Sequence, residues 1–339
     1  SMIYHFHNLM RFHSCQLSCL GFVACVLLQT PAAATVVAPP SSTTATDTAR
    51  EIAATVNGKP IYASAIDTQI ELLIPNLDRK SARYQKLRRD LLAKTIDRHL
   101  ALEYLHHSKI AASNDDMQLA IIRLEKRLKL KQQSLDDYLR EQEISPAELR
   151  HRIDWQISWN RYLNKYVSDT NLKKYFTDYK SQFDGTTSEI SQILLASHPA
   201  DPAKQKATFD QAKQIIRDVR ADSISFSAAA KKYSISPTGK TGGLVGVIKY
   251  RGSMPLQFSN IAFALEVGEV SVPFESEFGV HILRCNSINM GTRTWQQARP
   301  QLREALVESF FSFLVNTRRE MLKTENKLEK HIEINSAWQ

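Results

Sequence analysis

The chain has 339 residues, of which 43% are hydrophobic and 23% charged, the composition of an ordinary globular protein with room for two domains. Its formal net charge is +9, from 44 Lys and Arg against 35 Asp and Glu. The basic residues are scattered through predicted helices among acids. We therefore interpret them as solvated helix faces and predict no nucleic-acid partner.

Cysteine and glycine spacing argue against two further kinds of site. Cys15, Cys19 and Cys25 all fall in an apolar N-terminal stretch, so Cys285 stands alone beyond it and no intrachain disulfide framework is expected there. No Cys and His residues have zinc-type spacing, and no phosphate-binding Gly loop precedes a predicted helix. We predict no metal site and no cofactor, and we expect Cys285 to be a buried core residue.

The N-terminal stretch is typical of an export signal. The apolar run Leu17–Leu28 is followed by small residues at 32–34, which predicts a signal peptide over residues 1–34, cleaved near Ala34 or Ala38. The run is short for a membrane span of about 20 residues, and an uncleaved anchor, the one expected membrane contact, is the alternative. Residues 35–51 are rich in Ala, Pro, Ser and Thr and are predicted to be a flexible linker. The chain is thus expected in the periplasm or cell envelope.

A mostly helical domain is predicted over residues 52–187. Asn57-Gly58 is a two-residue hairpin turn between the β-like runs 52–56 and 59–62. Apolar residues then recur at helical spacing, and Ser145-Pro146 with Glu148 marks a helix start. The layout from VNGKPI to ISPAELRHRI resembles the N-terminal chaperone region of SurA- and PrsA-like folding factors.

The next segment alternates strand and helix patterns in the order β-α-α-β-α-β-β. Strands are expected at 190–195, 244–248, 269–272 and 280–283, and helices at 203–220, 226–233 and around Met254 and Phe258. Met254 and Phe258 are four residues apart and share one face of a helix. The pattern predicts a mixed four-stranded sheet flanked by helices, and an α+β fold class for the chain.

A specific series of residues follows the Gly242-Gly243 turn. It comprises Gly246, Met254, Phe258, Ala262-Phe263, Leu265, Gly268 to Ser271, Pro273, Phe278-Gly279 and His281-Ile282. In this order the residues resemble the parvulin (PpiC-type) peptidyl-prolyl isomerases. The resemblance implies an isomerase domain over residues 188–288. It also implies unfolded or proline-containing polypeptides as partners, an apolar substrate pocket and a small polar network.

The resemblance assigns a role to eight residues. Met254, Phe258, Val245 and Phe278 are expected to bind the substrate proline, and His281, Gln192, Ser236 and Ser276 to form the catalytic polar group. Gln192 stands where parvulins usually have His, and Ser236 where they have Cys or Asp. The main prediction is an exported peptidyl-prolyl isomerase and chaperone, with activity reduced by these two departures. The alternatives are a chaperone whose parvulin domain only binds clients, and an assembly factor for one envelope system.

The last segment, residues 289–339, is predicted to be a C-terminal helix. Thr294 and Gln297 have capping-box spacing, Pro300 should kink or restart the helix, and an apolar stripe follows from Leu302 to Met321. By resemblance to SurA-like proteins, this helix should pack back on the N-terminal domain. Ile332 and Ile334 are expected to add a strand beside residues 52–56, which makes the isomerase domain an insertion.

Overall fold

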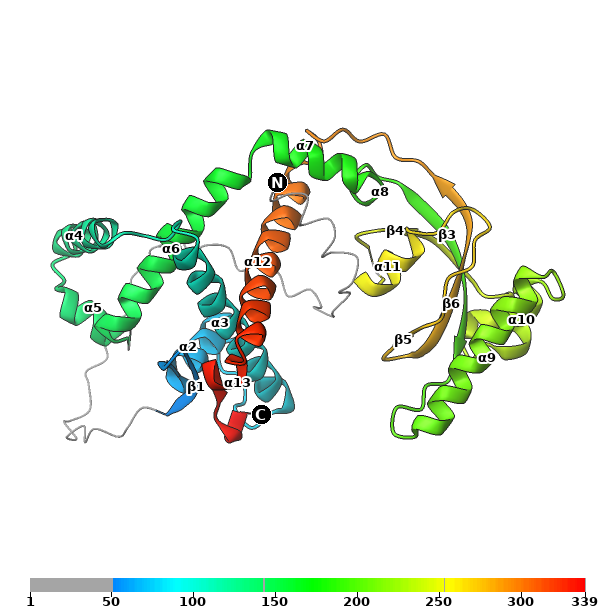
Figure 1. Ribbon diagram of the computed structural model, residues 1–339, viewed down its shortest axis with the longest axis horizontal. Coiled ribbons are helices and arrows are strands. Elements are labelled where there is room, and N and C mark those ends of the chain that lie inside the picture. Colours follow the sequence, from blue (N-terminus) through cyan, green and yellow to red (C-terminus); the bar gives the residue numbers. More distant parts are fainter. Residues whose placement is uncertain (1–50, 143, 253, 339) are drawn as a thin grey trace. The chain divides into compact units, whose positions relative to one another are not determined.

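The computed structural model describes residues 51–142, 144–252 and 254–338 (Figure 1). The predicted signal peptide and all but the last residue of the predicted linker lie outside this part. The described chain forms two compact units, one of residues 169–304 and one of residues 51–168 together with 305–338. None of the described helices is long and apolar enough to cross a membrane.

A small sheet in the second unit brings distant segments together. Strand β1 (Ile52–Val56) pairs antiparallel with β2 (Lys59–Tyr62) through the predicted turn, in which Asn57 and Gly58 both have positive φ. Strand β7 (Ile332–Ile334) pairs with the other edge of β1, giving the order β2-β1-β7. The predicted strand beside residues 52–56 is confirmed.

Helices complete this unit, and serine caps set their starts. They are α2 (Ala63–Leu73), α3 (Ala82–His107), α4 (Asn114–Leu130), α5 (Leu135–Glu141), α6 (Pro146–Tyr166), α12 (Arg299–Thr324, of which residues 305–324 belong to this unit) and α13 (Leu328–His331). The side chains of Ser113, Ser134 and Ser145 each accept a hydrogen bond from the backbone three residues on. The helix start predicted at Ser145-Pro146 is confirmed.

One apolar core joins α12 to the N-terminal helices. Leu314 and Leu322 of α12 belong to the same buried cluster as Leu100 of α3 and Tyr162 of α6. Helix α12 begins at Arg299, so Pro300 lies in its first turn, where a missing N–H costs nothing. The Thr294 and Gln297 pair forms as predicted, because each side chain meets the backbone N–H of the other residue.

The first unit is built on an antiparallel sheet. Its strands are β3 (Thr187–Leu195), β4 (Leu244–Lys249), β5 (Phe274–Ser276) and β6 (Gly279–Asn289), in the order β4-β3-β6-β5. Its helices are α7 (Asp169–Asp178), α8 (Lys180–Phe183), α9 (Pro202–Arg220), α10 (Phe226–Tyr233) and α11 (Leu256–Ala262), with a 3₁₀ turn at Pro237–Thr241. The α+β class and the four-stranded sheet flanked by helices are confirmed.

Two details of the predicted sheet are wrong. The sheet is not mixed, because β4 and β6 both run antiparallel to β3, and β5 and β6 are also antiparallel. Residues 269–272 form no strand; Val270 makes one isolated bridge to Arg284, and the strand begins at Phe274. The Ser271 hydroxyl accepts the Leu283 N–H, so a side chain replaces the carbonyl that a regular ladder needs.

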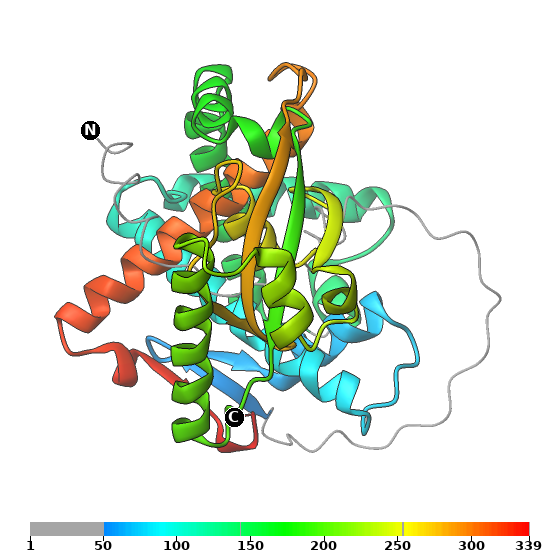
Figure 2. The same ribbon diagram turned by 90° about the vertical axis from the view of Figure 1, so that its right-hand side faces the viewer.

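Each face of this sheet has its own helical cover. Ile193, Leu195, Val280 and Ile282 lie on the face covered by α9 and α10. Figures 1 and 2 show these two helices on the same side of β3 and β6. The opposite face, with Ile190, Leu283 and Cys285, packs against α11. Cys285 is fully buried, as predicted.

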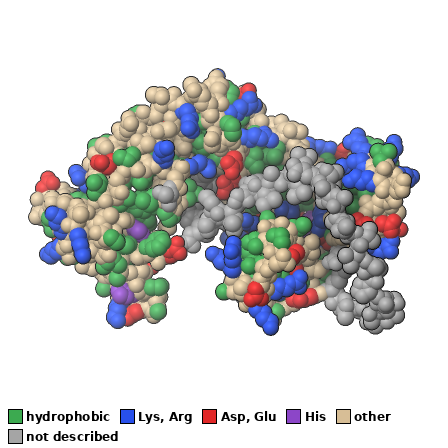
Figure 3. Space-filling model, turned by 180° about the vertical axis from the view of Figure 1, so that it is seen from behind, with side chains coloured by type: hydrophobic (Ala, Val, Ile, Leu, Met, Phe, Trp, Pro, Cys, Tyr) green, Lys and Arg blue, Asp and Glu red, His purple; other side chains and the backbone are tan. Residues whose placement is uncertain are grey.

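Charged side chains are scattered over the surface of both units (Figure 3). On the face seen in Figure 3, Lys and Arg are spread over the described surface with Asp and Glu among them. Some of the basic residues have an acidic partner one helical turn away, as Lys174 has Asp178 and Lys206 has Asp210.

Candidate functional site

The register of β3 and β6 places two polar side chains together on the α11 face of the sheet. Leu194 pairs with His281 and Gln192 with Leu283, so Gln192 and His281 are diagonal neighbours. A close approach of β4 supports them, since the Gln192 N–H donates to the Gly243 carbonyl at 2.8 Å. Gly243 has φ +85°, and a Cβ there would lie 2.5 Å from the Gln192 carbonyl oxygen.

A continuous chain of hydrogen bonds joins all four predicted polar residues. His281 Nε2 lies 2.6 Å from Ser276 Oγ, and His281 Nδ1 lies 3.3 Å from Gln192 Oε1. The Gln192 amide donates to Ser236 Oγ at 3.3 Å. Ser236 Oγ in turn lies 3.0 Å from the hydroxyl of Thr238, so the chain extends one residue beyond the predicted group.

The directions of these bonds fix the tautomer of His281. Gln192 uses its NH₂ group toward Ser236, so its carbonyl oxygen faces His281, and Nδ1 must carry the proton. In a neutral ring Nε2 is then an acceptor, and Ser276 donates to it. The Ser276 oxygen itself accepts the backbone N–H of Phe278 at 3.0 Å, so both capacities of the hydroxyl are used.

The site is electrically neutral. Its polar members are an imidazole, an amide and hydroxyl groups. Burial lowers the pKa of His281 below its ordinary value of about 6.5, so the ring is uncharged at pH 7.

Aromatic rings hold the imidazole in place. Phe274 stacks on His281 with ring centroids 5.0 Å apart, and Phe258 meets it edge-on at 6.0 Å. Both phenylalanines are buried, and Met254 and Val245 pack against the same apolar cluster. Three of the four predicted proline-binding residues therefore share one cluster beside the polar chain.

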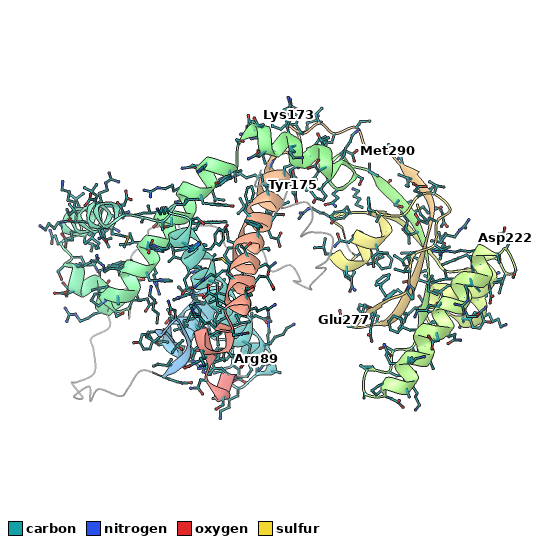
Figure 4. The ribbon with its side chains drawn as sticks, in the orientation of Figure 1. Arg89, Lys173, Tyr175, Asp222, Glu277 and Met290 are labelled. Atoms are coloured by element: carbon teal, nitrogen blue, oxygen red, sulfur yellow. The ribbon has the colours of Figure 1, made fainter. Side chains whose placement is uncertain are left out.

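The structure departs from the predicted site in two places. Met254 does not share a helix with Phe258, because α11 starts at Leu256, and Met254 reaches the cluster from the preceding loop. Phe278 is 62% exposed and lies outside the cluster, because the turn between β5 and β6 contributes its backbone and not its ring. Glu277, labelled in Figure 4, belongs to the same turn.

Sequence reasoning missed two members of the site. Phe274 stacks on His281, and Thr238 ends the polar chain. The signals were present: Phe274 alternates with Ser276 along one strand, and Thr238 lies two residues after Ser236. Because the predicted strand covered residues 269–272, Phe274 fell outside it and its alternation with Ser276 was not apparent.

Two family models match the chain. Residues 193–287 match the PPIC-type PPIASE domain, and residues 11–163 match the SurA-like N-terminal domain. Both predicted resemblances are confirmed.

Three curated proteins with similar sequences agree with these matches. The foldase protein PrsA of Caldanaerobacter subterraneus is 24% identical over 58% of this chain and 60% of its own length. The putative peptidyl-prolyl cis-trans isomerase NifM of Azotobacter vinelandii is 28% identical over 41% and 48%. The chaperone SurA of Aromatoleum aromaticum is 24% identical over 74% and 59%. The chain spans between about half and three fifths of each relative's length.

A solved structure of PrsA from Bacillus cereus overlays 81% of this chain and 92% of that chain, at 17% identity. Its TM-score is 0.35, too low to add to the family matches.

Proposed function

Because the chain carries a PPIC-type peptidyl-prolyl isomerase domain and a SurA-like N-terminal domain, we propose that it is an exported peptidyl-prolyl isomerase and chaperone. The observation that carries the proposal is the neutral chain Ser276–His281–Gln192–Ser236 lying against Phe258 and Phe274. Its clients are unfolded polypeptides that contain proline. The apolar run at residues 17–28 supports export to the periplasm or cell envelope.

The chemistry needs no charged catalyst. Rotation about an X-Pro bond crosses a barrier of about 18–20 kcal/mol, and no covalent bond is made or broken. The barrier falls when the twisted amide is bound better than the planar one, by about tenfold in rate for each 1.36 kcal/mol. An apolar surface that removes water from the imide, beside fixed neutral hydrogen-bonding groups, has both required properties.

Each residue then has a distinct role. Phe258, Met254 and Val245 hold the pyrrolidine ring. His281 and Ser276 contact the reacting imide, while Gln192 positions His281 and Ser236 positions Gln192. Phe278 contacts the client chain at the rim, since its ring is exposed beside the Ser276 turn.

We also propose the domain organisation. The isomerase domain occupies residues 188–288 and interrupts a chaperone domain made of residues 52–187 and 289–339. The shared core of α3, α6 and α12 supports one interrupted domain. The compact unit around the sheet is longer than the isomerase domain at both ends, because α7, α8 and residues 289–304 group with it.

The second candidate is a chaperone that binds prolyl segments without isomerising them. Gln192 and Ser236 favour it, since both replace groups that parvulins usually have. The two functions differ in one measurable respect, because only the isomerase shortens the relaxation time of a prolyl bond.

The test is relaxation of an X-Pro peptide after a solvent jump, using the full chain without its signal segment. Wild type should accelerate relaxation, and His281→Ala should lose at least tenfold. Phe258→Leu should also lose activity, with a smaller volume change than Phe258→Ala. Leu256→Ala, on an exposed residue of the same helix, is the matched control.

Suppression of client aggregation is measured on the same samples. If clean wild type suppresses aggregation but leaves prolyl relaxation unchanged, the isomerase proposal fails and the second candidate stands. If neither effect is seen, both fail.

A further inference from the structure

A concave surface lies in the sheet-containing unit, formed by residues outside the isomerase site. Its volume is about 430 Å³, within the range of ligand sites. It is lined by Phe176 of α7, Lys180 of α8 and the linker Gly291–Gln296, which we call the linker groove. Figure 4 labels two residues next to the groove in sequence, Lys173 on α7 and Met290 immediately before the linker.

The backbone N–H groups on one edge of the linker already donate hydrogen bonds within the unit. The Gly291 N–H donates to Thr186 Oγ1 at 3.0 Å, and the Arg293 N–H donates to the Asp184 carbonyl at 2.8 Å. Gly291 permits this contact, since a Cβ there would lie 2.1 Å from the Asp184 oxygen. Alternate N–H groups of an extended chain point to opposite sides, so Thr292 presents its backbone to the other edge. Among the described residues, its N–H has no acceptor.

The side chains of the linker groove combine aromatic rings with positive charge. Phe176 and Trp295 supply the apolar surface, and Lys173 Nζ lies 5.8 Å from the Trp295 ring centroid. In the described part of the chain, Lys180 and Arg293 have no carboxylate partner. Asp178 is paired with Lys174 at 3.0 Å, and Asp169 is paired with Arg299 at 2.7 Å. Asp184 is buried and forms no ion pair in the described part of the chain; one carboxylate oxygen accepts the Thr186 N–H and the other has no hydrogen-bond partner.

We propose that the linker groove binds an extended acidic segment of polypeptide, separately from the isomerase site. The segment pairs its backbone with the free edge at Thr292, as strand addition does elsewhere. One of its carboxylates meets the Arg293 guanidinium, whose planar fork suits bidentate pairing, and a second meets Lys180. An apolar or aromatic side chain between them rests on Phe176 and Trp295. Lys173, Lys180 and Arg293, which form no ion pair in the described part of the chain, select for this charge pattern.

The experiment measures binding of a dye-labelled eight-residue peptide with Glu-Phe-Glu at its centre to the full chain. A Gln-Phe-Gln peptide is the neutral comparison. The acidic peptide should bind at least tenfold tighter and should weaken as salt rises. Lys180→Gln with Arg293→Gln should abolish that preference. Lys213→Gln with Lys231→Gln, which removes two exposed cations from α9 and α10, should leave it intact.

A charge-reversal variant distinguishes loss of the binding site from loss of peptide binding through misfolding. Lys180→Glu with Arg293→Glu should prefer a Lys-Phe-Lys peptide, and an unfolded protein gives no such switch. Prolyl relaxation of a neutral peptide should be unchanged in these variants, so failure here is separable from failure of the proposed function. Equal binding of the acidic and neutral peptides, or wild-type affinity in the double variant, overturns the proposal. So does binding of a single-stranded oligonucleotide, but no peptide, at these residues.

Discussion

Gln192 and His281 face each other across β3 and β6, with the Gln192 amide oxygen 3.3 Å from His281 Nδ1. The contact orients the imidazole, because an amide oxygen only accepts hydrogen bonds. The ring therefore presents its proton to Gln192 and its free electron pair to Ser276. A glutamine thus connects two parts of a neutral network that a nonpolar residue would separate.

Replacing Gln192 with Leu should lower kcat/KM for prolyl isomerisation at least tenfold. The substitution keeps the side-chain size but leaves His281 Nδ1 and Ser236 without their partner, which costs roughly 1–3 kcal/mol. Gln192→His should keep the wild-type rate or raise it, because a neutral imidazole can also donate one hydrogen bond and accept another. Gln211→Leu, on the exposed face of α9, is the control. An unchanged rate in Gln192→Leu would show that the contact does not serve catalysis.

Gly243→Ala should destabilise the sheet-containing unit by at least about 2 kcal/mol. Positive φ costs a non-glycine residue roughly 1–2 kcal/mol, and the new Cβ would also clash with the Gln192 carbonyl oxygen. Gly246→Ala is matched to it, because Gly246 has φ +106° but no atom within 4 Å of the added Cβ. Denaturant unfolding should show the larger loss for Gly243→Ala. Equal losses would mean that backbone strain alone accounts for both.

The unit with the N-terminal helices should lose stability as pH falls below about 6.5. His99 and His151 stack with centroids 3.9 Å apart, and burial lowers their pKa values to about 3 and about 4. Nearby Lys59 and Arg98 act in the same direction, while Asp154 opposes them for His151. The unfolded chain therefore binds more protons than the folded one below pH 6.5.

The loss between pH 6.5 and pH 4 should be on the order of several kcal/mol, at 1.36 kcal/mol per pKa unit. Unfolding free energies across this range check it, comparing wild type with His99→Gln combined with His151→Gln. The double variant should have a much flatter pH profile. His107→Gln, at an exposed position, should keep the wild-type slope. Parallel profiles for all three proteins would exclude the stacked pair as the cause.

Glu103→Gln should destabilise the same unit by about 2–3 kcal/mol. Glu103 Oε2 lies 3.0 Å from Arg318 Nε of α12 and 2.7 Å from His331 Nε2 of α13, and all three side chains are largely buried. Removing one charge leaves a partly desolvated cation without its partner. Glu320→Gln breaks only an exposed pair with Lys323 and should cost less than about 1 kcal/mol. Thermal unfolding distinguishes the two, and similar shifts would mean that the Glu103 cluster adds little.

Local chemistry predicted much of this fold, because caps and turns depend on residues close in sequence. Ser145, Pro146 and Asn57-Gly58 behave as their residue types dictate. The β1–β7 pairing joins residues far apart in sequence, and it was expected only from the resemblance to SurA-like proteins. The predictions that were wrong, the strand at residues 269–272 and the mixed sheet, concern pairing between strands that are far apart in sequence. Near Ser271 a side-chain hydroxyl accepts the Leu283 N–H and residues 269–272 form no strand, so the strand begins only at Phe274. Phe274 was recognisable as part of the site only once the position of that strand was known.

The pairing of β7 with β1 has a consequence for the order in which the protein folds. Residues 169–304 hold every strand of their own sheet in one continuous stretch, so that unit can form as soon as it has been synthesised. The other unit lacks its third strand until residues 332–334 emerge from the ribosome. Its first helices must wait, with part of their apolar surface uncovered, while the inserted segment is made.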